Sequence, residues 1–468
     1  MSRFSLIYIG LFSIIISILS FFNIIYSYYF NFYLNLNNYV YSLIISLLFS
    51  ALFIFKKKDL NKPTIYEKIL TVVSGYLIIP IFISIPYYLS IYNISFIDSY
   101  FESISGFTST GFSIFENVKH LDPSIILWRS SSQWVGGLYF LFSIILLIDI
   151  FDINLKKSLT NFLSFNTSEI SKQYLKILIL YTSLTFVIFI ILKLINIRTF
   201  DSFNLAITLI SSGGFLPTND LNSILNNKIK IITTSFLMLF SFFSIFLSYN
   251  LLRIKNKTLN FFQEDFYLSI YLFFLIVFFF LLFNYEYNFS DIFLSLASSV
   301  SNIGISTKSF NNNNLFILFI LTIIGGSFFS TSSGIRFIKL FTLFKYSINE
   351  LISHVKPKNV FITKLRFSKL ISDTSDINKI FLSLLIFIIS LIILSSILTI
   401  TGINFENSLK ISILTLMNTV NSDMHNLSDF SFQNLQYITK YSLILFMIIG
   451  RVELLTILII LKKFFLKN

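Results

Sequence analysis

Four short tracts of small polar residues carry the groups that could do chemistry in this sequence. They comprise, in chain order, Thr108, Ser109, Thr110 and Gly111; Ser211, Ser212, Gly213 and Gly214; Ser301, Asn302, Ile303 and Gly304; and Asn418, Thr419, Val420 and Asn421. Backbone carbonyls that line one axis can replace the hydration shell of a cation. Glycine helps because an inward-turned carbonyl needs φ angles that a Cβ disfavours. The tracts therefore predict four segments that together bind a cation.

The tracts share a registered pattern when they are aligned on Gly111, Gly214, Gly304 and, by elimination, Asn421. The third and second positions before each anchor hold a hydroxyl or amide pair in every tract. Thirteen positions before the anchors stand residues typical of helix N-caps: Asp98, Asp201, Asp291 and Ser408. Apolar side chains at helical spacing follow each of them, which predicts a short buried helix before each tract. Four unrelated turns are the alternative explanation.

The composition places these segments in a membrane. Apolar residues make up 55% of the chain and charged residues 12%, with a mean hydropathy of +0.80, whereas a soluble domain has about 25% charged residues. Six apolar runs approach or exceed the roughly 20 residues that cross a bilayer: Ser5 to Tyr29, Ile69 to Tyr92, Ile125 to Ile150, Tyr174 to Ile195, Phe266 to Phe283 and Ile380 to Ile400. The sequence predicts an all-α polytopic membrane protein.

Several other chemistries are excluded by residue type. The chain has no Cys, which removes disulfides, thiolate metal sites and Cys nucleophiles. His120, His354 and His425 lack metal-ligand spacing, and no P-loop motif is present. The first apolar run is too long for a signal peptide and lacks a small-residue cleavage site, so we expect it to be retained as a helix.

The net charge of +13 reports topology rather than nucleic-acid binding. With the N-terminus inside, most Lys and Arg residues fall in cytoplasmic connections, as the positive-inside rule requires. The largest basic stretch runs from Arg336 to Lys379. Both termini are therefore expected in the cytoplasm of a bacterial cell, and the protein in its inner membrane.

Motifs in several segments resemble the Trk/Ktr/HKT superfamily of potassium and sodium transporters, and the resemblance covers nearly the whole chain. The motifs are Phe101 to Gly111, Trp128-Arg129-Ser130 with Gln133 to Gly137, Gly325 to Arg336, and Met447 with Gly450 to Glu453. The resemblance implies four membrane–pore–membrane repeats in a pseudo-fourfold arrangement around one pathway. It also implies K⁺ as the transported ion, with no organic cofactor in this chain.

The resemblance divides the chain into six parts. We expect a Trk-type N-terminal helix pair at 1–62, pore repeats at 63–165, 166–260 and 261–350, a basic cytoplasmic loop at 351–375, and a fourth pore repeat at 376–468. Family members form homodimers and are gated by a cytoplasmic ring with nucleotide-binding domains. The basic loop is the natural docking surface for that ring, although anionic lipids would attract it equally. No nucleic-acid partner is expected.

A glycine- and serine-rich interruption divides the apolar segment from Leu315 to Phe344. Its residues are Gly325, Gly326, Ser327, Phe328, Phe329, Ser330, Thr331 and Gly334. Glycine and hydroxyl residues weaken helix formation, so an unwound stretch is predicted. In the family this loop blocks the cytoplasmic side of the filter, and here the Phe pair replaces small residues and would make a drier plug. A packed helix kink is the alternative.

Arg451 lies inside the apolar run from Tyr441 to Leu461. An ionisable residue at that depth normally faces a cavity or a partner. The resemblance makes it an electrostatic barrier to cations just below the filter, and an ion pair with Glu453 or another acid is the alternative. Arg129, near a helix start, is expected to snorkel or to pair with Glu102.

The fourth tract departs from the family pattern, because Asn421 stands where glycine is expected. Asn is the commonest residue other than glycine with positive φ, so the backbone shape could be retained. Three intact glycines favour potassium, and the altered tract leaves a sodium-selective or weakly selective transporter as the alternative. A non-conducting, degenerate subunit and a membrane-embedded enzyme are two further alternatives. The hypothesis of a membrane-embedded enzyme lacks support, because His and paired acids are missing from the predicted membrane spans.

Overall fold

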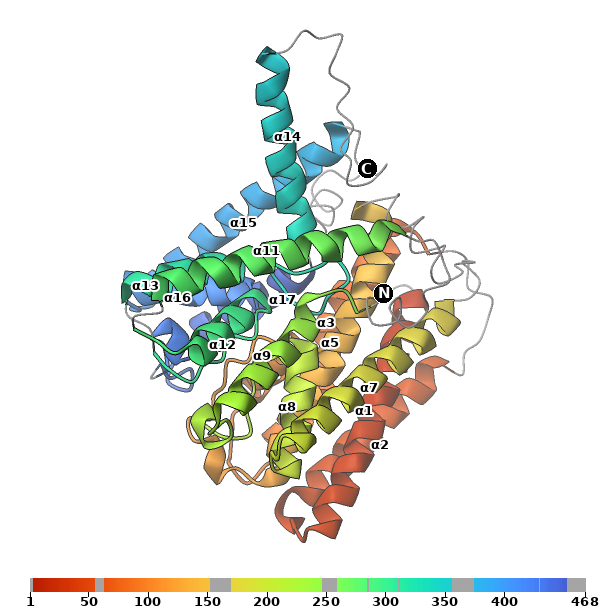
Figure 1. Ribbon diagram of the computed structural model, residues 1–468. Helices are drawn as coiled ribbons and strands as arrows, with labels where there is room; N and C mark the ends of the chain where they lie inside the picture. The colour runs from red at the N-terminus through yellow and green to blue at the C-terminus, as the bar shows by residue number, and fades with distance from the viewer. Residues whose placement is uncertain are drawn as a thin grey trace.

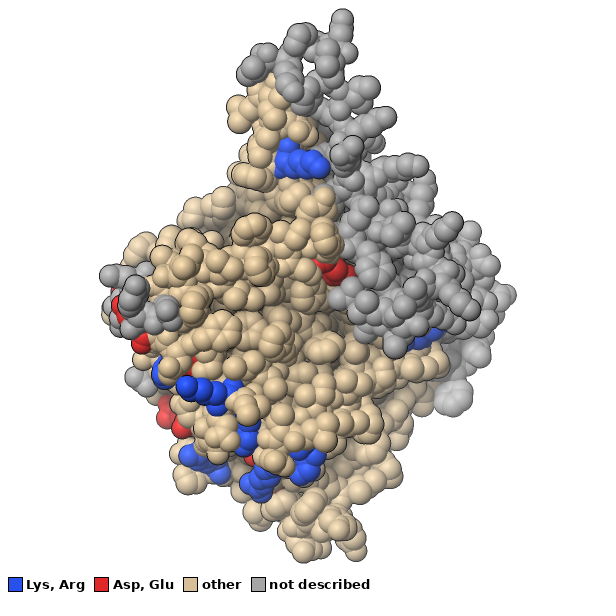
Figure 2. All heavy atoms as spheres, viewed as in Figure 1, with Lys and Arg blue, Asp and Glu red and all other residues tan. Residues whose placement is uncertain are grey.

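The computed structural model describes residues 3–54, 63–151, 170–245, 259–283, 286–309, 312–355, 374–428 and 430–452. The apolar runs form helices in these residues, and seven helices are long and apolar enough to cross a membrane. An apolar helix can span a bilayer because its backbone groups are bonded within the segment. Figure 2 shows a wide face of uncharged side chains over the body of the molecule. The chain is an all-α polytopic membrane protein.

Two helices precede the repeats and pack against each other at one edge of the molecule (Figure 1). They are α1 (Arg3–Tyr29) and α2 (Leu36–Ile54), joined by the short helix η1 (Tyr33–Asn35). Helix α1 also packs against α3 and α5 of the first repeat.

Each repeat contains an outer helix, a short pore helix and an inner helix. Their bounds are α3 (Ile65–Tyr88), α4 (Phe96–Phe107) and α5 (Pro123–Phe151); α7 (Ile170–Leu194), α8 (Thr199–Ser211) and α9 (Lys228–Phe242); α11 (Leu259–Phe283), α12 (Phe289–Val300) and α13 (Asn312–Ile323) with α14 (Phe337–Val355); and α15 (Thr374–Ile400), α16 (Phe405–Leu416) and α17 (Tyr437–Val452). Three short helices, η2 (Val118–His120), η3 (Leu221–Ser223) and η5 (Asp423–His425), follow the first, second and fourth tracts.

The repeats close into a ring. Each inner helix packs against the pore helix of the next repeat: α5 on α8, α9 on α12, α13 on α16, and α17 back on α4. This cyclic packing places the C-terminal ends of the pore helices around one centre, where the four tracts begin. The pseudo-fourfold arrangement expected from the sequence is thereby confirmed.

The predicted N-caps of the pore helices are wrong. The helices begin after Ser95, Arg198, Asn288 and Asn404, so Asp98, Asp201 and Asp291 lie at the third helical position and Ser408 at the fourth. In α4 the true cap is visible, because the Ser95 hydroxyl accepts the Asp98 N–H at 3.2 Å. A carboxylate in the first turn still suits the positive end of the helix dipole.

The predicted interruption separates α13 from α14. Two short strands, β1 (Ile324–Gly325) and β2 (Ile335–Arg336), pair in parallel and bring the ends of the loop together. Beyond it, α14 projects from the body of the molecule (Figure 1). Helix α14 continues to Val355 and α15 begins at Thr374; residues 356–373 of the predicted basic loop lie outside the described residues.

Candidate filter, gate loop and arginine

The four tracts begin with the same backbone conformation. Just after each pore helix, one residue has a left-handed φ. These residues are Ser109 (57°), Ser212 (55°), Asn302 (57°) and Asn418 (48°). A polar side chain that can bond locally tolerates this conformation, which explains Ser and Asn at these positions. Counting two residues on from each gives Gly111, Gly214, Gly304 and Val420.

Backbone hydrogen bonds give the same register. The residue after each left-handed position donates its N–H to the carbonyl five residues earlier. The bonds are Thr110 to Ser105 (2.9 Å), Gly213 to Thr208 (2.9 Å), Ile303 to Ser298 (3.0 Å) and Thr419 to Leu414 (2.9 Å). The predicted alignment on Asn421 is therefore wrong by one residue, because residue type suggested Asn as the glycine substitute. In the corrected register, Met417 occupies the first position of the predicted polar pair in the fourth tract.

Asn421 lies one step beyond the filter level. Its Nδ2 donates to the carbonyl of Leu427 at 3.0 Å, so it braces the loop that leads to α17. The next residue, Ser422, donates its hydroxyl to the carbonyl of Gly304. Both side chains thus hold the outer segment of the fourth tract instead of standing in for glycine.

The polar side chains of the tracts tie the ring together. Asn418 Nδ2 donates to Thr110 Oγ1 at 3.0 Å and to the carbonyl of Met447 at 2.9 Å. The Ser212 hydroxyl donates to the carbonyl of Ser301. The hydroxyls of Thr108 and Thr110 bond to each other at 2.7 Å. The polar pairs predicted from the sequence therefore act partly as braces between tracts.

The backbone N–H of the last residue in each tract distinguishes two kinds of tract. Those of Gly111 and Gly304 point back to the carbonyls of Ser105 and Ser298, at 3.3 Å in both cases. The N–H of Gly214 instead donates to the side-chain oxygen of Gln133 at 3.0 Å when that amide is oriented to accept. The N–H of Val420 points to the carbonyl of Ile303 in the neighbouring tract at 3.4 Å.

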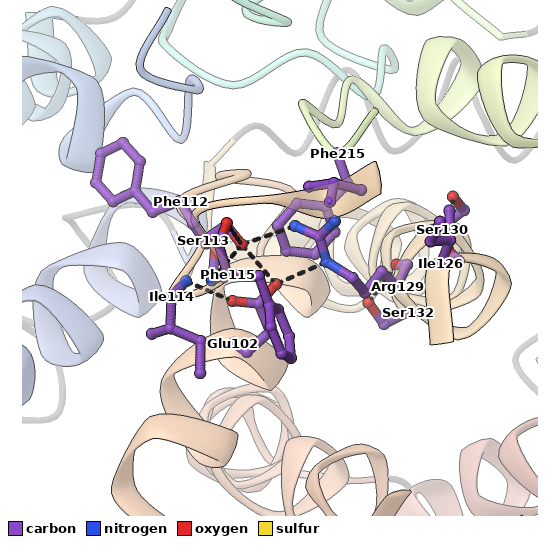
Figure 3. A network of polar contacts seen from close by, with 12 residues as sticks. Glu102, Phe112, Ser113, Ile114, Phe115, Ile126, Arg129, Ser130, Ser132 and Phe215 are labelled. Carbon is purple, nitrogen blue, oxygen red and sulfur yellow. Dashed lines mark hydrogen bonds and ion pairs between the residues drawn. The ribbon is translucent and has the colours of Figure 1, made fainter. Parts of the chain in front are cut away.

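A buried ion pair supports the segment that follows the first tract (Figure 3). Glu102 of α4 and Arg129 of α5 pair at 2.8 Å, with exposures of 0% and 2%. The other Glu102 oxygen accepts the N–H of Ile114 at 2.9 Å. Ser113 bonds both partners. The predicted alternative in which Arg129 pairs with Glu102 is confirmed.

Phe215, which follows the second tract, covers the Arg129 guanidinium at 4.1 Å from its ring centre (Figure 3). The pair thus joins the first filter to the second. Gln133 also lies on α5 and supports the second filter directly. Gln133 belongs to a motif identified in the sequence, but the sequence does not predict its hydrogen bond with the second tract.

The loop from Gly325 to Gly334 lies beneath the filter and is buried throughout, apart from a half-buried Gly334. Thr331 donates to the carbonyl of Ile210 at the end of α8, at 2.7 Å. The backbone N–H groups of Ser327 and Ser332 donate to Phe242 and Ser241 at the end of α9. Hydrogen bonds therefore join the loop to the second repeat.

Two charged residues hold the loop: Arg336, which ends the predicted motif, and Glu264, which the sequence analysis did not single out. Arg336 Nη1 donates to the carbonyls of Ser327 (3.0 Å) and Ser332 (2.9 Å). Glu264 of α11 accepts the N–H of Phe328 at 2.9 Å. Phe328 and Phe329 are themselves 2% and 1% exposed and contact each other edge to face. The loop is thus a packed unit, although its composition resembles that of a flexible linker.

Arg451 lies between the loop and the filter. One guanidinium nitrogen donates to the hydroxyl of Ser333, and another lies 3.4 Å from the hydroxyl of Ser109. The guanidinium also stacks on Phe140 at 3.9 Å. Among the described residues no carboxylate forms an ion pair with Arg451, which is 1% exposed; Glu453 lies outside them. The predicted filter, loop and arginine are therefore brought together.

The four residues predicted as N-caps lie away from this centre, at the opposite ends of the pore helices. Asp98 pairs with Lys440 of α17 at 2.6 Å, and Asp291 pairs with Lys308 at 2.8 Å. Ser408 donates to the carbonyl of Ile403. These side chains fix the outer ends of the pore helices.

Comparison with known proteins finds sequence similarity to ion transporters. No family model matches it. It is 27% identical over 327 residues to an uncharacterized cation transporter of Methanocaldococcus jannaschii, covering 67% of this chain and 66% of that protein. It is 24% identical over 400 residues to the Trk system potassium uptake protein TrkG of Escherichia coli, covering 80% of each.

The fold has a close counterpart among solved structures. The crystal structure of the potassium transporter TrkH from Vibrio parahaemolyticus superimposes with a TM-score of 0.83 at 19% identity, over 98% of this chain and 99% of that chain. The chain is thus similar in sequence to Trk system potassium uptake proteins, and it has the fold of the TrkH structure.

Proposed function

We propose that the chain is a pathway for potassium uptake across the inner membrane. Four carbonyl-lined tracts form its filter, the loop from Gly325 to Gly334 its gate, and Arg451 a barrier to cations. The single observation that carries the proposal is the meeting of these three features at the centre of the ring. The potassium named for its relatives supports the choice of ion.

Arg451 fits a barrier role because its charge is not cancelled by an ion pair within the described residues. A cation leaving the filter beside Ser109 would meet a guanidinium held in a low-dielectric setting, where charge repulsion is strong. The loop below it closes the same path, since Ser333 of the loop is the hydrogen-bond partner of Arg451. Movement of the loop would free the arginine to turn aside.

The cellular arrangement belongs to the same proposal. Both termini and α14 would lie in the cytoplasm, where a ring with nucleotide-binding domains would dock and control the loop. A homodimer in a lipid bilayer is the expected assembly. The charge distribution along the sequence supports this orientation.

A sodium-conducting or weakly selective pathway is the second candidate. It is favoured by Val420, which occupies the level at which the other three tracts have glycine. A filter with one altered tract would coordinate potassium less completely than four alike tracts, which would weaken its preference for potassium over sodium.

Uptake in cells tests the function. The chain, expressed with a Trk-type regulatory subunit in a bacterial strain that lacks potassium uptake, should restore growth at low potassium and carry rubidium in preference to sodium. Comparable rubidium and sodium fluxes would favour the second candidate. Absence of any cation flux from correctly folded protein would exclude both candidates.

Replacing Arg451 by Ala should raise basal rubidium flux, because the charge below the filter is removed. The matched control is Arg451→Lys, which keeps a positive charge and should keep flux near the wild-type level. Purified protein in liposomes with trapped potassium provides the measurement. Equal flux in all three proteins would contradict the barrier.

A further inference from the structure

Val420 stands at the level of the filter glycines and contacts all three of them. Its side chain is 8% exposed and lies among the tracts rather than in a membrane-facing position. The corrected register places it in line with Gly111, Gly214 and Gly304. The fourth tract thus offers two methyl groups where each of the others offers none.

The contacts show how little space is left at this level. A Cβ built on Gly214 would lie 2.7 and 2.9 Å from the two methyl carbons of Val420. A Cβ built on Gly111 would lie 3.0 Å from the Cβ of Val420 and 2.9 Å from the Cα of Gly214. One built on Gly304 would lie 2.7 Å from the Val420 carbonyl oxygen. The valine side chain therefore fills the space beside Gly111 and Gly214, and the Val420 backbone lies against Gly304.

Val420 also changes the direction of the backbone. Gly111 and Gly304 have φ angles of 84° and 83°, and Val420 has no positive φ. A β-branched residue is a strong outlier in that region, so the backbone at Val420 differs in φ from that at Gly111 and Gly304. The fourth tract thus presents an apolar side chain at this level, on a backbone of different conformation.

We propose that Val420 is an apolar constriction within the filter, and that it determines which cations pass and how fast. The inference rests on the proposed transport function and deepens it. A partly dehydrated ion gains nothing from methyl groups, so passage at this level requires displacement of the side chain. Val420 is stiff about χ1 because it is β-branched, which makes that displacement costly and sensitive to ion size.

A series of substitutions at one position tests the constriction. Val420→Gly should raise rubidium flux by about tenfold, which corresponds to ~1.4 kcal/mol of barrier, and Val420→Ala should give an intermediate increase. Val420→Ile should lower the rubidium flux below the wild-type level. The matched control is Val72→Ala, which removes the same atoms from a fully buried valine on α3, away from the filter. It should leave flux unchanged.

Ion size supplies a second readout. In liposomes that contain the purified protein with a Trk-type regulatory subunit, wild-type flux should fall steeply from potassium to rubidium to caesium, and Val420→Gly should flatten that decline. Thermal unfolding of each variant checks that it is folded.

The outcomes separate this inference from the transport function. If wild type and Val420→Gly conduct equally, with the same size dependence, Val420 is packing only and the inference is overturned. If no folded variant conducts any cation, the transport function itself fails.

Discussion

The first and third filters differ from the second and fourth. In the first and third, a glycine with positive φ ends the tract and its N–H points to the pore helix of its own repeat. In the second and fourth, no positive φ occurs at Gly214 or Val420, and the N–H is taken by Gln133 or by Ile303. The two kinds alternate around the ring.

This difference teaches that a fourfold repeat in sequence gives a twofold arrangement at the filter. Val420 is β-branched and does not take the positive φ of Gly111 and Gly304, and its side chain lies against Gly214. Two filters are therefore self-supported, and the other two rely on neighbouring elements.

The largest test of this comparison concerns the support of the first filter. Glu102→Ala leaves Arg129 buried without its carboxylate, which should cost about 3–5 kcal/mol. The control is Glu406→Ala on α16, which removes a 72% exposed partner of Lys410 and should cost within about 0.5 kcal/mol. Chemical unfolding in detergent measures both. Equal losses would mean that the first filter does not depend on its ion pair.

A double substitution tests the contact between the second and fourth filters. Gly214→Ala adds a Cβ against Val420 and should destabilise by about 1–3 kcal/mol, as overpacking does. Val420→Gly in the same chain removes the opposing side chain and should recover most of that loss. Unfolding of the two single variants and the double variant gives the coupling. Additive effects would show that the two filters do not share this space.

The smallest expected effect concerns the loop behind the fourth filter. Burial lowers the pKa of His425 to about 3, with the charge of Lys410 adding to the effect, and the ring packs on Phe319 at 5.0 Å. An unfolded His has a pKa of about 6.5, so the folded state binds fewer protons, and stability is full above pH ~6.5 and falls as the pH drops toward 3.

The wild type should lose about 1.4 kcal/mol between pH 7.5 and 5.5 through this group. His425→Phe keeps an aromatic ring and should lack this loss, so the difference between the two proteins isolates it. Unfolding at both pH values provides the measurement. An equal pH dependence in both proteins would show that His425 is not the titrating group.

The sequence predicted the helices, the interruption and the position of Arg451, because long apolar runs and isolated polar residues within them have few structural solutions. It failed at Asn421 and at the helix caps for a shared reason. Both predictions relied on residue type at one position, whereas the helix ends are set by local hydrogen bonds, such as the one from the Asp98 N–H to the Ser95 hydroxyl. The bond from Gln133 to the second tract depends on packing between repeats, which one sequence does not reveal.

The pairing of β1 with β2 bears on how the proposed gate loop, from Gly325 to Gly334, could move. Ile324 lies opposite Ile335 and Gly325 opposite Arg336, so the loop leaves and returns to the same point. If the loop opens as the proposed gate, it can therefore rotate about one hinge without lengthening the connection between α13 and α14. A force applied to α14 would then rotate the loop without stretching the chain.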